Sequence, residues 1–234
     1  MTANFRTIGF PDHLFRIAAG TFDLENFQTS SDSILSRFIR VAGMIEQRWA
    51  CQLEFATMAR EAWQEWKSFR ARLSGQAILF EMRAPAQELP LGAGAGFSES
   101  GSAQTITGTT ITGTTILQGG TSALVLETAP RYAQAVMLGF GADMAGDVVM
   151  KHGDLFGLGG NLYMSVGNVT ADASGEARVP FRWRLWKGAA IGDIVQLRHP
   201  TCRVQLRSAN VGPTQLSVET HGRAGYEAIE VPYL

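Results

Sequence analysis

The chain has 234 residues, of which 45% are hydrophobic and 18% charged, so it can bury a sizeable globular core. Twenty basic residues against 21 acidic ones leave a formal net charge of −1. This argues against nucleic acid as a main partner, because phosphate binding needs a concentrated positive excess. No apolar run reaches the length of about 18 residues that a membrane-spanning helix requires, so we expect no membrane insertion. The first 15 residues do not resemble a signal peptide, which predicts folding in the cytoplasm.

One segment before position 84 predicts an amphipathic helix. Thr57 offers an N-cap oxygen, and Gly75 offers a C-terminal stop. Between them, apolar residues recur at spacings of three and four, which places them on one face. These residues are Met58, Ala62, Trp66, Phe69 and Leu73, with Trp63 beside them.

Strands are predicted on both sides of this helix. Residues 48–55 alternate between apolar and polar side chains, which is typical of a half-buried strand, and residues 77–82 form a second β-rich run. The apolar face of this strand–helix–strand unit must be covered by more sheet, which we expect from the N-terminal segment and the C-terminal tail.

The composition changes near Ala84, and the remainder predicts an all-β region. More than half of the 26 glycines lie between positions 84 and 160, around a repeat, TITGT, at residues 105–109 and 110–114. We interpret this repeat as a β-hairpin or meander, because two copies are too few for a solenoid. Short strands separated by turns then predict a small barrel or sandwich. The expected strands are 148–150, 155–158, 162–166 and 177–181, followed in the tail by 204–206, 215–219 and 226–231.

The sequence offers no catalytic, cofactor-binding or metal-binding group, so we expect no enzyme. The four histidines are well separated, and Cys51 and Cys202 lack neighbouring ligands, so the cysteines are interpreted as core residues. Asp154 and Asp193 each follow a glycine, which indicates turns rather than a pair of acid–base carboxylates. The glycines of residues 92–96 are not followed by a helix start, which favours a loop over a phosphate site.

Residues 182–187 (RWRLWK) interleave basic and aromatic side chains. A nucleic-acid stripe would show this pattern. In a strand, however, Arg182, Arg184 and Trp186 would share one face, while Phe181, Trp183 and Leu185 would share the other. We therefore favour an edge or interface strand. The excess of arginine over lysine fits protein interfaces, although GC-rich coding explains it equally well.

The order of these patterns resembles a known family. From Trp49 to Glu81, an aromatic strand, a helix ending Phe-x-x-x-Leu-x-Gly and the run Ile-Leu-Phe-Glu are similar to the belt region of the distal tail proteins of long-tailed phages. Downstream, a Gly-Asp turn, a Gly-Gly hairpin, a Tyr strand and an Asp-Ala-Ser-Gly hairpin resemble a module of phage tail-tip proteins. These segments are Lys151–Gly160, Leu162–Tyr163, Thr170–Gly175 and Val179–Phe181.

The resemblance implies a mainly β fold with one amphipathic helix (α+β). A discontinuous belt β-sandwich domain would comprise residues 1–84 and 200–234. A small OB- or galectin-like β-barrel would occupy residues 85–199. The belt of such proteins carries an extension loop, for which residues 25–40 are the candidate.

The function implied by the resemblance is structural. Six copies would form a ring in the virion tail tip of a phage or gene transfer particle, joining the tail tube protein to hub, baseplate or fibre proteins. Contacts between copies are expected at the helix region 57–74 and the Gly/Thr-rich loops. The alternative is a carbohydrate-binding tail module that attaches to host-surface glycan through Trp183 or Trp186. The residues predicted to lie at interfaces are Trp49, Trp63, Trp66, Phe69, Arg182, Arg184 and Trp186.

Overall fold

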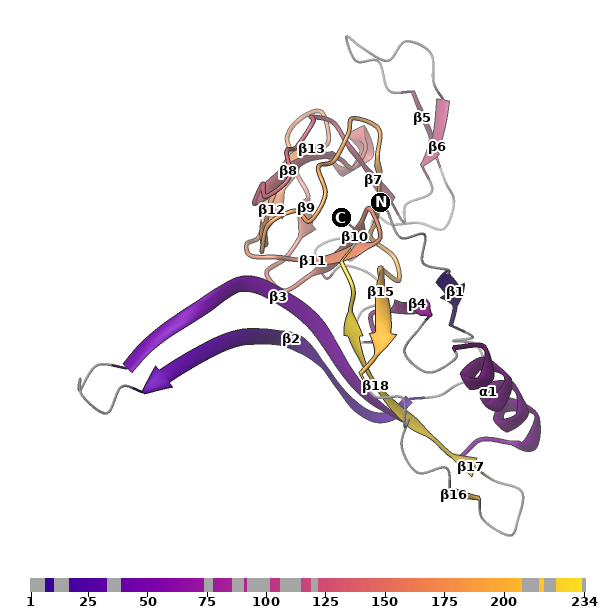
Figure 1. Ribbon diagram of the computed structural model, residues 1–234. Helices are drawn as coiled ribbons and strands as arrows, with labels where there is room; N and C mark the ends of the chain where they lie inside the picture. Colours follow the sequence, from indigo (N-terminus) through magenta and orange to yellow (C-terminus); the bar gives the residue numbers. More distant parts are fainter. Residues whose placement is uncertain are drawn as a thin grey trace. The chain divides into compact units, whose positions relative to one another are not determined.

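The computed structural model shows a mainly β chain with one α-helix, divided into two compact units (Figure 1). It describes residues 7–10, 17–32, 39–73, 78–85, 91, 102–105, 115–118, 122–207, 215–216 and 222–232. Unit 1 combines Met1–Met82 with Arg203–Pro232, and unit 2 comprises Arg83–Cys202 with Tyr233–Leu234. The boundaries expected from the sequence were 84/85 and 199/200.

Unit 1 is built on a six-stranded mixed sheet, ordered β1-β4-β15-β18-β3-β2. β1 pairs in parallel with β4, whereas β15, β18, β3 and β2 pair antiparallel in that order. Strands from both ends of the chain are therefore interleaved, which explains why the unit is discontinuous in sequence. The strand bounds are β1 (Thr7–Gly9), β2 (Ile17–Asp32), β3 (Ile39–Phe55), β4 (Leu79–Arg83), β15 (Thr201–Leu206) and β18 (Gly225–Glu230).

Helix α1 (Arg60–Leu73) packs its predicted apolar stripe against this sheet. Its buried residues Trp66 and Phe69 meet Phe55 of β3 and Phe80 of β4, with ring centroids 5.2 Å apart for Phe55–Trp66 and 5.5 Å for Phe69–Phe80. Tyr226 of β18 completes the contact, 6.0 Å from Trp66. The aromatic cluster is the core of unit 1, and aromatic burial on this scale dominates packing energetics.

The start of the helix differs from the prediction. Helical structure begins at Arg60, and Trp63 N donates to Ala59 O (3.0 Å), so Thr57 is not the N-cap. Met58 instead forms a β-bridge and is buried. The bridged Met58 keeps the chain extended at this point, so the helix begins two residues later, at Arg60.

Strands β2 and β3 form a long antiparallel hairpin, paired from Ile17↔Phe55 to Asp32↔Ile39. Among the described residues, β18 pairs with β3 only over Ala50–Glu54, so the remainder of β3 has β2 as its sole strand neighbour. Figure 1 shows this outer part of the hairpin extending past the other strands of the unit. The segment 25–40, predicted as an extension loop, therefore includes parts of both paired strands; its residues 33–38 lie outside the described residues.

Unit 2 contains a closed six-stranded barrel, ordered β10-β11-β13-β8-β7-β14. Its interior is filled by apolar side chains, with the rings of Phe156, Tyr163 and Phe181 within 5.7 Å of one another. Side chains fill a barrel of this size, so it has no open channel. The strands are β7 (Ser122–Val125), β8 (Ala135–Gly139), β10 (Leu155–Leu158), β11 (Asn161–Ser165), β13 (Glu176–Arg182) and β14 (Ile194–Gln196).

Short elements accompany the barrel and the sheet. A 3₁₀ turn (Ala142–Met144) follows β8. The TITGT repeat lies almost entirely outside the described residues, but the strands that flank it, β5 and β6, pair antiparallel as a hairpin would. The remaining paired strands are β5 (Ser102–Thr105) with β6 (Thr115–Gln118), β9 (Val148–Met150) with β12 (Val169–Thr170), and β16 (Gln215–Leu216) with β17 (Gly222–Arg223).

Candidate functional site

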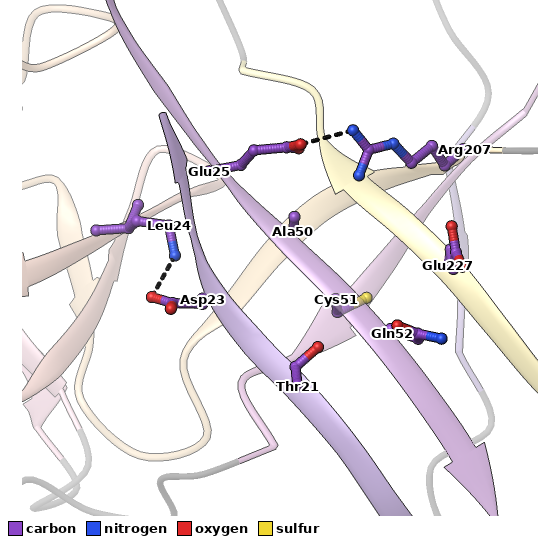
Figure 2. Close-up of a pocket in the computed structure, with 9 residues that line it drawn as sticks. All are labelled: Thr21, Asp23, Leu24, Glu25, Ala50, Cys51, Gln52, Arg207 and Glu227. Atoms are coloured by element: carbon purple, nitrogen blue, oxygen red, sulfur yellow. Dashed lines mark hydrogen bonds and ion pairs between the residues drawn. The ribbon is translucent and has the colours of Figure 1, made fainter. Parts of the chain in front are cut away.

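A surface hollow of about 420 Å³ lies on the sheet of unit 1, where the long hairpin joins the other strands (Figure 2). Strand alternation explains its polar lining. On β3, the side chains of Trp49, Cys51, Leu53 and Phe55 are buried, so those of Ala50 and Gln52 lie on the opposite face of the sheet. The residues that line the hollow are Thr21, Asp23, Leu24, Glu25, Ala50, Cys51, Gln52, Arg207 and Glu227.

An ion pair crosses this hollow. Arg207 Nη2 donates to Glu25 Oε1 at 2.6 Å, joining the residue after β15 to strand β2 across 182 positions of sequence. The hydrogen bond that Arg207 donates to Glu25, together with the negative charge of Glu25, raises the pKa of the Arg207 guanidinium, and the charge of Glu227 adds to this. Because Arg207 is about half exposed, solvent screens the pair, and its contribution to stability is small.

The hollow contains no group suited to covalent chemistry. Cys51 is its single thiol, and burial raises the pKa of that thiol to about 12, despite an opposing hydrogen bond from the backbone at Ala228. The neutral thiol is a poor nucleophile. Within the part of the chain that the structure describes, no group of three or more His, Cys, Asp or Glu side chains is arranged to hold a metal ion. The arrangement is suited to polar contact with another surface.

The turn aspartates have structural partners, as their Gly-Asp settings indicated. Asp154 is buried and accepts hydrogen bonds from the backbone N–H groups of Lys151 (2.6 Å) and Leu91 (2.9 Å). Asp193 accepts from Ala190 N at 2.9 Å. Asp172 similarly closes the Asp-Ala-Ser-Gly hairpin by accepting from Ser174 N at 2.8 Å. Each carboxylate therefore shapes a turn.

Four of the predicted interface residues lie inside unit 1. Trp49, Trp63, Trp66 and Phe69 are only 6%, 5%, 1% and 2% exposed, respectively. Trp49 stacks on Phe22 with ring centroids 4.8 Å apart, and the other three belong to the buried face of α1. Their apolar area is already covered within the chain, so it is not available to a neighbouring copy.

The other three predicted interface residues remain accessible. Arg182 and Arg184 are exposed, and Trp186 is half-buried against the barrel core. They do not form one continuous strand, however, because β13 ends at Arg182 and Trp183 has a positive φ of 74°. A period of two cannot continue through that conformation, so the predicted division into two faces applies only up to Arg182.

Comparison with models of known protein families and with curated proteins finds no match. No helix within the described ranges has the length and apolar character needed to cross a membrane.

Proposed function

We propose that this chain is a distal tail protein, a structural component of a phage tail tip whose copies assemble into a homohexameric ring. The ring would connect the tail tube to hub, baseplate or fibre proteins. The six-stranded unit with its helix would serve as the belt domain, of β-sandwich type, and the closed barrel as the inserted OB- or galectin-like domain.

The long β2–β3 hairpin carries this proposal. A two-stranded hairpin that extends beyond its sheet is marginally stable alone, because each strand has an edge of unpaired backbone groups. Over Ile39–Gln47, β3 has no described strand on its second side, and β2 is the edge strand of the sheet. Pairing with a neighbouring copy would satisfy those groups and bury both edges.

Side-chain contacts also hold the base of the hairpin against the rest of unit 1. Where β18 ends, the buried Glu230 accepts a hydrogen bond from Trp49 N (3.2 Å), which extends the ladder by one side chain. Phe22 stacks on Trp49 beside it, and the Arg207–Glu25 ion pair lies a few residues further along β2. These contacts fix the direction in which the hairpin leaves the sheet.

The experiment is a shortened hairpin examined by light scattering after size exclusion. Asn26 and Gln47 are paired, so residues 27–46 are replaced by an Asn-Gly turn that joins them directly. The native chain is expected near six times its mass of 25.3 kDa, and the shortened chain as a monomer.

The matched control shortens a different hairpin. Thr105 and Thr115 of β5 and β6 are also paired, so residues 106–114 are replaced by the same turn. This variant is expected to keep the native mass. A hexamer that survives loss of residues 27–46 would show that the hairpin does not hold the ring, and a native monomer at tens of micromolar would contradict the ring itself.

A further inference from the structure

Two adjoining segments of unit 2 form an irregular ribbon beside the barrel, defined as residues 129–134 and 181–189 and called here the cationic ribbon. Backbone hydrogen bonds join the segments: Tyr132 N to Leu185 O and Leu185 N to Ala133 O, both at 2.9 Å. A second pair links Ala129 and Ala189 in both directions. The two segments, about 50 residues apart in sequence, are thus one continuous surface element.

The charged side chains of the ribbon are all basic. Arg131, Arg182, Arg184 and Lys187 are all exposed, and neither segment contains an Asp or Glu. Four of the 20 basic residues of a chain with net charge −1 are therefore concentrated in 15 positions. A local excess of this kind attracts anionic groups and repels cationic ones.

The ribbon is held in place by buried residues set between the charges. Phe181 and Leu185 are buried in the barrel core, so Arg182 and Arg184 project from an anchored backbone. The half-buried Trp186 donates from its backbone N–H to the Tyr163 hydroxyl at 3.2 Å. The backbone of the ribbon is therefore already ordered, so binding of a ligand by the arginines costs little further backbone entropy.

Two aromatic residues in the ribbon adopt a backbone conformation that L side chains rarely accept. Tyr132 has φ 73° and Trp183 has φ 74°. Such conformations are energetically costly, and they cluster at active sites, ligand clamps and switch regions. Each ring lies under a neighbouring guanidinium: Arg131 is 4.7 Å from the Tyr132 centroid, and Arg182 is 5.2 Å from the Trp183 centroid. The strained backbone thus positions two cation–π pairs.

We propose that the cationic ribbon binds a carboxylate-rich segment of a partner protein. Arginine forks match carboxylates bidentately, and Tyr, Trp and Arg are the residues most enriched at the energetic centres of protein interfaces. Neutral sugar is disfavoured, because Trp183 and Trp186 are half-buried and the Tyr132 ring, although 52% exposed, is partly covered by Arg131. Single-stranded nucleic acid needs open rings for base stacking, so it is disfavoured for the same reason. This inference does not depend on ring formation.

The test measures binding of a dye-labelled ten-residue glutamate peptide to the full chain by fluorescence anisotropy. The native chain is expected to bind at about 0.05 M salt and to lose most of that affinity at about 0.5 M, because exposed charges are screened. The double variant Arg182→Gln/Arg184→Gln is expected to bind about tenfold more weakly or worse. Arg182→Lys/Arg184→Lys retains the charge without the fork and is expected to lose less.

The matched control is Arg60→Gln/Arg72→Gln, which removes two exposed arginines from α1 in unit 1. Its affinity is expected to equal that of the native chain. The proposal is overturned if the native chain fails to bind the peptide at about millimolar concentration, or if the control loses as much affinity as the ribbon variant. It is also overturned if single-stranded DNA or a uronic-acid oligosaccharide of equal charge binds more tightly through the same two arginines.

Discussion

Replacing Gly175 with alanine tests how the Asp-Ala-Ser-Gly hairpin supports the barrel. Gly175 has φ 76°, and its carbonyl accepts a hydrogen bond from Phe140 N at 2.9 Å, next to the end of β8. A Cβ at this position would lie well inside the van der Waals radius of the Gly141 carbonyl oxygen and 2.9 Å from Ala142 N. Those atoms belong to backbone, which cannot rotate away as a flexible side chain would.

Three costs add in the Gly175→Ala variant. The left-handed conformation costs about 1–2 kcal/mol for an L side chain. Displacing the Gly141 backbone adds about 1–3 kcal/mol of strain, and weakening the Phe140–Gly175 hydrogen bond adds about 1 kcal/mol. We expect a total loss of about 3–6 kcal/mol, a large share of the roughly 5–15 kcal/mol that stabilises a typical domain.

Gly146→Ala is the matched control. Gly146 has φ 80°, but no atom lies within 4 Å of its added Cβ, so the control is subject to the conformational cost alone, about 1–2 kcal/mol. Native-state hydrogen exchange, followed by mass spectrometry on peptides covering β8 and β13, gives the local free energy of opening. Equal losses in the two variants would refute the argument, because they would show that the close approach to Gly141 has no energetic consequence.

Three further predictions concern buried groups. Trp66→Ala should lower the free energy of unfolding by about 3–5 kcal/mol in urea titration, because a 1% exposed ring is removed from the aromatic cluster. Asp154→Ala should cost about 2–4 kcal/mol by the same assay, because the backbone N–H groups of Lys151 and Leu91 lose their acceptor. Burial raises the pKa of the Cys51 thiol from 9.0 to about 12, so the thiol of the unfolded chain ionises at a lower pH than that of the folded chain. The contribution of the neutral, buried thiol to folding stability is therefore complete below pH 9 and is lost between pH 9 and 12. The free energies of unfolding of the native chain and of Cys51→Ala, measured by urea titration across that pH range, should therefore converge. A constant difference between them would contradict the raised pKa of Cys51.

The local elements of the fold follow from the sequence. The helix was predicted because Trp66, Phe69 and Leu73 repeat at helical spacing, and the structure buries all three. Strand β3 was anticipated over residues 48–55 because its side chains alternate, and burial there alternates in the same phase. Both patterns are carried by neighbouring residues, so no knowledge of distant contacts is needed.

Features that depend on residues far apart in the chain could not be predicted from the sequence. The sequence indicates that Trp49 and Trp63 avoid water, but not whether the same chain or another covers them, because both environments favour the same side chain. The Arg207–Glu25 pair joins residues 182 positions apart, so no local spacing signals it. The surface hollow depends on that pairing and on strands from both ends of the chain, and it was missed for the same reason.

The structure of residues 182–187 also differs from the sequence-based prediction of a strand, because of the backbone conformation at Trp183. Residues 182–187 alternate in sequence as a strand would, but the positive φ of Trp183 ends β13. The composition of the segment does not predict that conformation, since tryptophan rarely adopts it. Burial of Phe181 and Leu185 on either side fixes the segment, and only the folded barrel supplies that constraint.

The most direct test of the proposed ring is negative-stain electron microscopy of the purified full chain at tens of micromolar, with two-dimensional class averages viewed end on. A distal tail protein of the kind proposed predicts closed particles with six-fold symmetry, which disappear when residues 27–46 are replaced by the Asn-Gly turn. Compact single-chain particles in the native sample, or closed rings that persist without the hairpin, would contradict the account.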